Sequence, residues 1–173
     1  PSDKSIVNYN LFENDFVKKL ANYVDARKFA ALSHVVDMTE LFGDSFGHLG
    51  EIPESLLLQP IFEDFGEDAK IVAHFLAVLE WDIYFKNILH TGADGIILVV
   101  KDTCNKEFSF EINGPKVTFL GDGDFHDNRY DHMVRTTRFA AFKDDGDEQL
   151  LEDDEACKFY LYIYPSDKMH GLY

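Results

Sequence analysis

The sequence predicts an α+β fold in which an antiparallel sheet carries helices on one of its faces. Apolar residues recur every three or four positions over residues 10–36, whereas residues 95–120 and 158–164 follow strand patterns. The chain has 173 residues and is 46% hydrophobic, which is enough apolar material for a core. Helical patterns therefore come first, and the strands of the sheet follow them.

The segment Asn10–Val36 has the spacing of one or two amphipathic helices, with Asn14 or Asp15 as the start. Its periodic apolar residues are Phe12, Phe16, Leu20, Val24, Phe29, Leu32 and Val36. The next segment, Gly43–Pro60, contains three glycines and two prolines. Such spacing of Gly and Pro is typical of a loop broken by short turns.

Lys70–Trp81 is an apolar run that could form a buried strand or a buried helix. We favour a strand, because Asp82–Leu89 then carries a short helical pattern. The next three segments predict an antiparallel meander whose second turn is the Asn113-Gly114 hairpin signal. They are Gly95–Lys101, Glu107–Ile112 and Lys116–Leu120.

A polar cluster spans Gly121–His132, and a short amphipathic stretch follows through Met133, Val134 and Phe139. The acidic run Asp144–Glu155 is typical of a solvated loop, and Lys158–Tyr164 predicts the last strand. This order of elements is the layout of PAS-like sensor domains. It predicts a helical N-terminal portion and loop over residues 1–50 and a PAS-like sensor core over residues 51–173.

The net charge of −16 excludes some partners. Nucleic acid requires a basic footprint, so we expect no nucleic-acid partner, and an anionic membrane surface is disfavoured for the same reason. No apolar run approaches the roughly 18 residues that span a bilayer. Residue 1 is Pro and no targeting signal follows it, which is typical of a fragment or a trimmed product.

The chain has two cysteines, Cys104 and Cys157. Such a pair can form a bridge in an oxidising compartment or remain two reduced, buried thiols in the cytosol. Their spacing does not decide between these states. The absence of a Cys-x-x-Cys motif makes a zinc ribbon or a thioredoxin-type redox pair a poor interpretation.

Several stretches together resemble the extracellular region of receptor-type adenylate and guanylate cyclases of diatoms and related algae. The resemblance covers roughly residues 51–170 and is weaker over residues 1–50. The stretches that carry it are Trp81–Leu89, Gly95–Val100, Thr103–Phe110, Phe119–Asp127 with Tyr130-Asp131, and Cys157 with Tyr164-Pro-Ser166.

This resemblance implies an extracellular sensor that is part of a plasma-membrane protein. It implies that the segment is not itself an enzyme and that an intracellular class III cyclase domain performs the catalysis. It further implies a Cys104–Cys157 disulfide, an unidentified small extracellular ligand, and a homodimer formed through the parent receptor.

The polar cluster offers candidate metal ligands. Carboxylates of Asp122, Asp124, Asp127 and Asp131 could hold Ca²⁺, although the spacing is not that of an EF-hand. His126 and His132, with Asp127 or Asp131, could instead hold a transition metal. The alternative is a turn in which Asp and Asn side chains accept hydrogen bonds from nearby backbone amides, so that no cofactor is bound.

Trp81, Tyr84 and Phe85 could line a ligand pocket, or they could pack in the core. Two other function classes remain as alternatives to a sensor. One is a structural or dimerisation ectodomain that exposes an apolar face on the Phe12–Val36 helices. The other is a fragment of a metal-dependent nucleotide-processing domain, because Lys116–Asp122 superficially resembles the Gly-Asp hairpin of class III cyclase catalytic domains.

Overall fold

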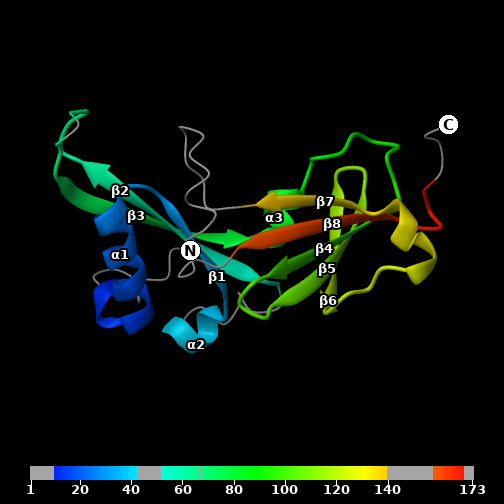
Figure 1. Cartoon of the computed structure of the whole chain (residues 1–173), viewed down its shortest axis with the longest axis horizontal. Helices are drawn as coiled ribbons and strands as arrows, with labels where there is room; N and C mark the ends of the chain where they lie inside the picture. The colour runs from blue at the N-terminus through cyan, green and yellow to red at the C-terminus, as the bar shows by residue number, and fades with distance from the viewer. Residues whose placement is uncertain (1–9, 43–51, 67, 140–157, 170–173) are drawn as a thin grey trace, which may run out of the picture. The chain divides into compact units, whose positions relative to one another are not determined.

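The computed structural model describes residues 10–42, 52–66, 68–139 and 158–169, and these form two compact units (Figure 1). Unit 1 contains the described residues up to Leu79, and unit 2 contains those from Glu80 onward. Each unit has its own antiparallel sheet, of three strands and five strands respectively. The prediction of an α+β fold is confirmed, but the strands form two sheets where one was expected.

Unit 1 is a three-stranded sheet with one long helix packed on it. Its sheet order is β1 (Ala31–Val36), β2 (Glu54–Phe62) and β3 (Ile71–Glu80). Helix α1 (Asp15–Arg27) follows the short 3-10 helix η2 (Leu11–Glu13), and α2 (Met38–Phe42) follows β1. The core is aliphatic, and its buried members are Val17, Ala21, Val24, Ala31, Met38, Leu56 and Leu58.

Helix α1 begins where the sequence predicts and ends earlier. The Asn14 side chain accepts hydrogen bonds from the N–H groups of Phe16 and Val17, which makes it the N-cap. Lys28 adopts the left-handed conformation with φ 56° and ends the helix. The expected continuation through Leu32 and Val36 is wrong, because these residues lie in β1.

The sequence of β1 fits both the alternation of a strand and the three- to four-residue spacing of a helix. Ala31, Ser33 and Val35 alternate as its buried residues, which is the strand period of two. Two of these three residues are small. The larger apolar residues of the strand therefore dominated the pattern, and their spacing of three and four suggested a helix.

The predicted loop over residues 43–60 is partly wrong, because its second part is β2. Residues 43–51 lie outside the described ranges. Glu54–Leu58 pairs with β1, and Pro60 lies two residues beyond the last β1 partner. A proline can stand there because no β1 residue opposite it needs its missing N–H.

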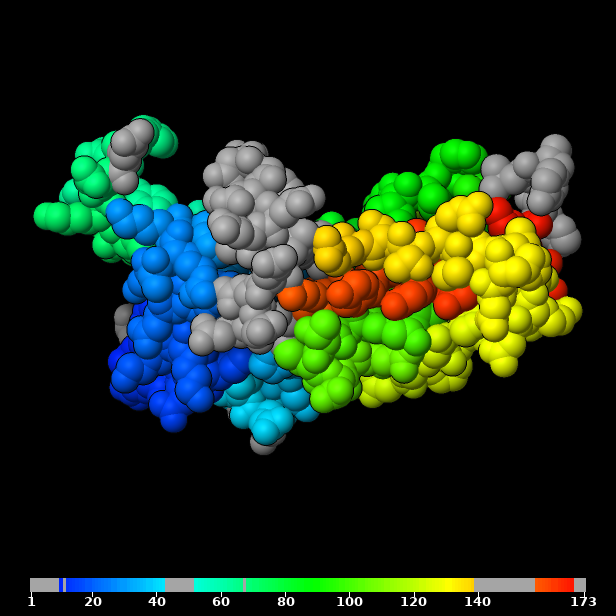
Figure 2. All heavy atoms as spheres, viewed as in Figure 1, coloured from blue at the N-terminus to red at the C-terminus, as the bar shows by residue number. Residues whose placement is uncertain are grey.

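Unit 2 has the strand order β6-β5-β4-β8-β7. The predicted meander forms as β4 (Ile96–Asp102), β5 (Glu107–Asn113) and β6 (Lys116–Asp122), and β8 (Phe159–Pro165) is the predicted last strand. Strand β7 (Arg135–Phe139) pairs with β8, and their side chains run next to each other across the visible face in Figure 2. The sequence indicated only an amphipathic stretch there.

An aromatic cluster fills the core of unit 2. The indole of Trp81 packs against the rings of Phe85, Phe108 and Phe159, with centroids 4.9–5.8 Å apart. Trp81 begins the short helix α3 (Trp81–Phe85). The helix was expected to continue to Leu89, but Lys86 is its C-cap and Asn87 has a positive φ of 62°.

The compact units do not divide at residue 51, where the sequence suggested a boundary. Strand β2 pairs with β1, and β3 is hydrogen-bonded to β2, so both belong with the N-terminal helix. The division falls between Leu79 and Glu80. No helix within the described ranges is long and apolar enough to cross a membrane.

Candidate functional site

The polar cluster predicted over residues 121–132 forms a folded loop at the end of β6, leading into the 3-10 helix η4 (Asn128–Met133). Gly121 and Gly123 have φ values of 134° and 104°, which glycine adopts readily. The buried Ser109 hydroxyl on β5 donates to the Gly123 carbonyl at 2.7 Å and accepts from the Phe125 N–H at 3.1 Å. The loop is thus hydrogen-bonded directly to the sheet.

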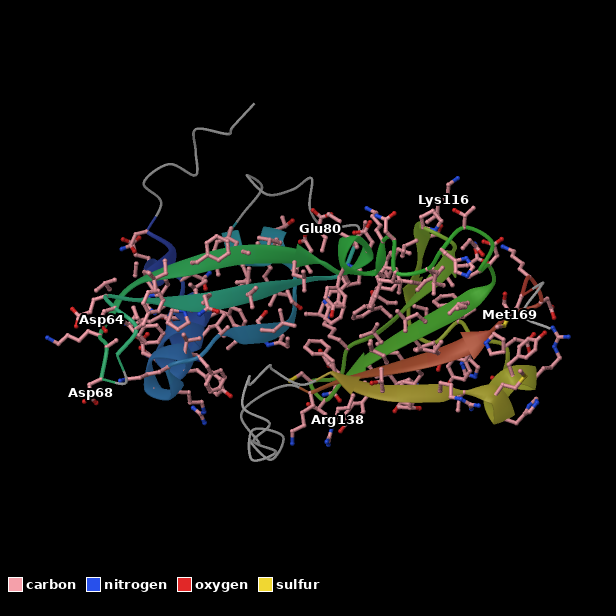
Figure 3. All side chains as sticks on the ribbon, turned by 90° about the horizontal axis from the view of Figure 1, so that it is seen from above. Asp64, Asp68, Glu80, Lys116, Arg138 and Met169 are labelled. Atoms are coloured by element: carbon pink, nitrogen blue, oxygen red, sulfur yellow. The ribbon has the colours of Figure 1, made fainter. Side chains whose placement is uncertain are left out.

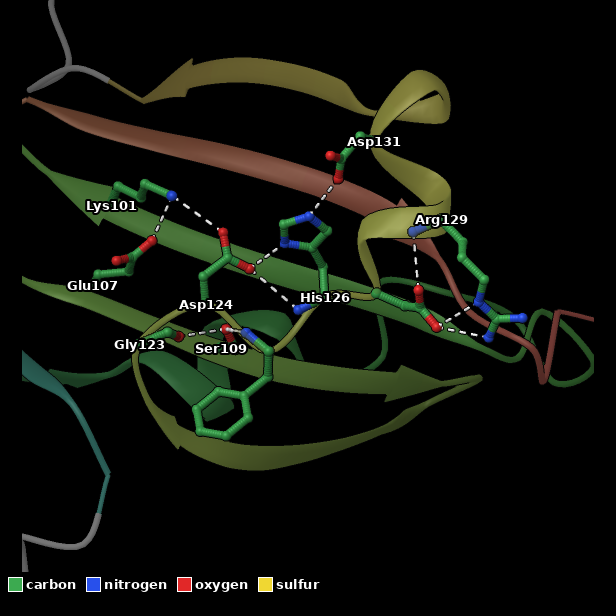
Figure 4. A network of polar contacts seen from close by, with 10 residues as sticks. Lys101, Glu107, Ser109, Gly123, Asp124, His126, Arg129 and Asp131 are labelled. Carbon is green, nitrogen blue, oxygen red and sulfur yellow. Dashed lines mark hydrogen bonds and ion pairs between the residues drawn. The ribbon is translucent and has the colours of Figure 1, made fainter.

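His126 lies between two carboxylates within this loop (Figure 4). Its Nδ1 contacts Asp124, and its Nε2 lies 2.7 Å from Oδ1 of Asp131 on η4. The ring is stacked on Tyr164 of β8, with centroids 3.9 Å apart and planes 9° apart. The imidazole side chain is 13% exposed.

This geometry favours the charged imidazolium. A carboxylate only accepts hydrogen bonds, so both ring nitrogens of His126 must donate, and a neutral ring has one N–H. Burial opposes the charge on the ring, but the hydrogen bonds to Asp124 and Asp131 outweigh burial and raise the pKa of His126. Stacking on the Tyr164 face also favours a cation.

Lys101 extends the cluster on to β4. Its ammonium lies 3.1 Å from Oδ2 of Asp124 and also pairs with Glu107 on β5. Burial of Asp124 works against its charge, but its hydrogen bonds with His126 and Lys101 outweigh burial, so its pKa lies below the ordinary value. Burial likewise opposes the charge on Lys101, yet its carboxylate partners raise its pKa.

A second group of polar contacts joins η4 to the turn that follows β8. Asp127 is the N-cap of η4 and accepts from Nε and Nη2 of Arg129 at 2.9 and 2.6 Å. Arg129 also donates to Asp167 at 2.7 Å, and the Tyr130 hydroxyl donates to the same carboxylate. These hydrogen bonds lower the pKa values of Asp127 and Asp167.

The candidate metal ligands are not arranged around one point. His126 contacts Asp124 through one ring nitrogen and Asp131 through the other, whereas Asp127 faces Arg129. Asp122 lies in β6, paired with Phe108, and His132 is exposed on η4. Within the described ranges, no three His, Cys, Asp or Glu side chains are grouped to hold a metal ion.

An imidazolium whose nitrogens both donate offers no lone pair to a metal or to a substrate proton. The arrangement is therefore suited to holding three chain segments together through charge-assisted hydrogen bonds. It joins β4, the loop after β6, and η4.

The three aromatic residues expected to line a pocket have different environments. Trp81 and Phe85 are buried in the core of unit 2, whereas Tyr84 is exposed. Trp81 and Tyr84 contact each other edge to face, with centroids 6.1 Å apart. The core alternative therefore describes two of these residues.

Cys104 lies in the turn between β4 and β5, where its N–H donates to Oδ1 of Asp102 at 2.9 Å. Cys157 lies outside the described residues. The neighbours of the two cysteines are hydrogen-bonded, because the Thr103 N–H donates to the Lys158 carbonyl at 3.0 Å and the Lys158 N–H donates to Thr103 Oγ1 at 2.9 Å. The predicted disulfide stays a prediction.

Five members of the two polar groups lie outside the polar cluster that the sequence predicted over residues 121–132. They are Lys101, Glu107, Ser109, Tyr164 and Asp167. A signal was present for two of them: Lys101 is a charged residue that follows a purely apolar strand segment, and Ser109 is a polar residue between two phenylalanines. For the others, only the sheet pairing brings them to the loop.

Comparison of the chain with protein-family models, with curated proteins and with solved structures finds no match.

Proposed function

We propose that the chain is the extracellular, ligand-sensing segment of a receptor-type adenylate or guanylate cyclase, and that it performs no catalysis itself. In this proposal unit 2 is a PAS-like sensor domain, and an intracellular cyclase domain belongs to the same receptor. The whole assignment rests on the resemblance in the quoted stretches, and the placement of those stretches supports it.

One observation carries the proposal. The described parts of these stretches, which lie between residues 81 and 166, all belong to unit 2. They supply α3, β4, the turn before β5, the loop after β6, and the end of β8. A set of segments that builds one sheet and its polar cluster is what a shared domain requires, whereas chance similarities need not converge on one body.

The polar cluster supports a binding role more than a catalytic one. Its histidine, lysine and carboxylates satisfy one another, which rigidifies the loop and leaves His126 without an acceptor nitrogen for general-base work. Phe125 and Met133 are exposed close to this rigid loop in sequence. Rigid loops that present apolar side chains are common in binding sites.

The proposed mechanism is differential binding. An extracellular ligand stabilises one of two packings of the unit 2 sheet against its helical segments, and the membrane helices of the receptor transmit that change to the cyclase. A ligand with equal affinity for both packings would transmit no signal.

The Cys104–Cys157 disulfide is part of this proposal, because it depends on the extracellular location. The register of β4 and β8 supports this pairing, because Asp102 is opposite Phe159 and Thr103 bonds to Lys158.

A thermal-shift screen of the purified chain tests ligand sensing. The panel contains amino acids, organic acids, nucleosides, short peptides and Ca²⁺, and fluorescence of the single tryptophan, Trp81, reports unit 2. A ligand at about 100 times its Kd adds about 2.7 kcal/mol of stability, which shifts Tm by several degrees. A panel with no shift removes the ligand-sensing proposal.

The complete gene tests the receptor assignment separately. We expect apolar segments of about 20 residues on both sides of this chain and a class III cyclase domain after the second. A gene without a cyclase domain would overturn the receptor assignment even if a ligand binds.

A further inference from the structure

The described sheets have four edge strands, which are β1 and β3 in unit 1 and β6 and β7 in unit 2. The outer side of an edge strand presents unpaired N–H and C=O groups to any strand that approaches. Natural proteins hinder such pairing with short strands, bulges, prolines or charged side chains.

Three of these edges carry such features. Strand β1 has six residues and an irregular register between Leu32 and Val35. Strand β6 has an extra residue, Leu120, between the partners of Phe110 and Ser109. Strand β7 has five residues, of which Arg135 and Arg138 are charged.

Strand β3 has no acidic residue, lysine, arginine or proline before its last residue, Glu80. It has ten residues, and no Asp, Glu, Lys, Arg or Pro occurs between Lys70 and Glu80. Figure 3 shows it as the outermost strand of the unit 1 sheet, with β2 between it and β1. Its exposed apolar residues are Val72, Phe75 and Val78, at 60%, 56% and 37% exposure.

The positions of these residues point to a second copy of the same strand. Val72 and Val78 each lie three residues from Phe75. An antiparallel pair with its two-fold axis at Phe75 therefore places Val72 opposite Val78 of the partner subunit, and Phe75 opposite its own copy. The exposed apolar residues of one strand thus match those of the other.

Charge gives a second, independent match in the same register. Lys70 and Glu80 each lie five residues from Phe75, so Lys70 of one copy is opposite Glu80 of the other at both ends of the pair. The nine residues between them carry no carboxylate, so this contact brings no like charges together in a chain of net charge −16.

We propose that β3 is a homodimer interface, in which two copies pair antiparallel about Phe75 and join their three-stranded sheets into one of six strands. The inference does not rest on the receptor assignment, because the exposed apolar residues of this edge, Val72, Phe75 and Val78, lie in unit 1, whereas the receptor assignment places the sensor in unit 2. A monomeric chain that senses a ligand would overturn the dimer alone, and a dimer with another function would overturn the receptor assignment alone.

Sedimentation velocity of the full chain over a range of concentrations tests the interface. We expect a reversible dimer in the unmodified chain. Phe75→Lys places two ammonium groups opposite each other at the axis and should give a monomer at all concentrations. Ile61→Lys, on β2 and 44% exposed, is the matched control and should remain dimeric.

A charge exchange tests the register. Lys70→Glu alone and Glu80→Lys alone each place like charges opposite at both ends and should weaken the dimer about tenfold. The double variant restores opposite charges and should recover the original affinity. Far-UV circular dichroism and the melting curve of each variant check that the fold is retained.

A monomeric unmodified chain overturns the proposal, and so does a dimer that Phe75→Lys leaves intact. Failure of the double exchange to restore the dimer overturns the pairing about Phe75. Pairing of β3 with another protein would appear as the first of these outcomes.

Discussion

The two units form their cores from different kinds of side chain. Unit 1 places aliphatic residues between one helix and three strands, and its edge strand β3 keeps apolar side chains exposed. Unit 2 surrounds a single tryptophan with phenylalanines and has ion pairs across its five-stranded sheet. Fewer residues bury a smaller share of their surface, so the smaller sheet gains more from a partner strand.

The largest expected difference between the units comes from their cores. Phe108→Ala removes a buried ring that contacts Trp81, with centroids 5.7 Å apart, and should destabilise unit 2 by about 3–5 kcal/mol. Denaturant unfolding followed by Trp81 fluorescence measures this loss, because the variant retains the tryptophan.

The matched change in unit 1 is Leu58→Ala, which should cost about 2–5 kcal/mol in the aliphatic core. It should lower the midpoint of the unfolding transition of unit 1, followed by circular dichroism. The midpoint of the transition followed by Trp81 fluorescence should stay unchanged. Equal shifts of both signals would show that the two units unfold as one cooperative body.

A covalent bond would distinguish unit 2 further. If Cys104 and Cys157 are bridged, Cys104→Ala or reduction should lower the stability reported by Trp81 by about 2–4 kcal/mol. Mass spectrometry after alkylation, with and without reductant, measures the thiol state directly. Alkylation of both cysteines without reductant would contradict the bridge.

The polar cluster should make unit 2 sensitive to pH in a direction set by His126. Its pKa is raised in the folded chain, so its stabilising contribution is present below about 6.5 and is lost as pH rises through the folded value. The lost contribution should be about 1–2 kcal/mol, given that Asp131 is partly solvated. Asp124 acts oppositely: its lowered pKa gives stability that is lost when pH falls through that value.

His126→Gln should flatten the neutral-to-alkaline part of the pH profile, measured by urea unfolding with Trp81 fluorescence. His132→Gln, on the exposed surface of η4, is the matched control and should leave the profile as it is. An unmodified chain whose stability rises through this range would contradict the assigned charge state.

The smallest expected effect concerns the start of α1 in unit 1. Asn14→Ala removes the N-cap and the bond from its Nδ2 to the Leu41 carbonyl at 2.8 Å, and should cost about 1 kcal/mol. Asn14→Asp keeps the cap and should lose less. Asn10→Ala, at the exposed residue that precedes η2, should leave the circular dichroism transition of unit 1 unchanged.

Local signals predicted some elements well. The Asn14 cap begins α1, the Asn113-Gly114 turn joins β5 to β6, and the β-branched run before Lys101 is the central strand β4. The run before Trp81 is a strand, as expected, but it lies at a sheet edge with exposed side chains. Hydrophobicity alone indicated burial, which depends on what packs against the strand.

The sequence by itself determined the α+β class, the order of the meander and the polar character of residues 121–132. These features depend on residues close together in the chain, through periodicity, capping and turn chemistry. Only the tertiary structure decided that the strands divide between two sheets, that Trp81 is a core residue, and that His126 lies between Asp124 and Asp131 on Tyr164. Long-range strand pairing sets these contacts, and local sequence does not encode which distant strands meet.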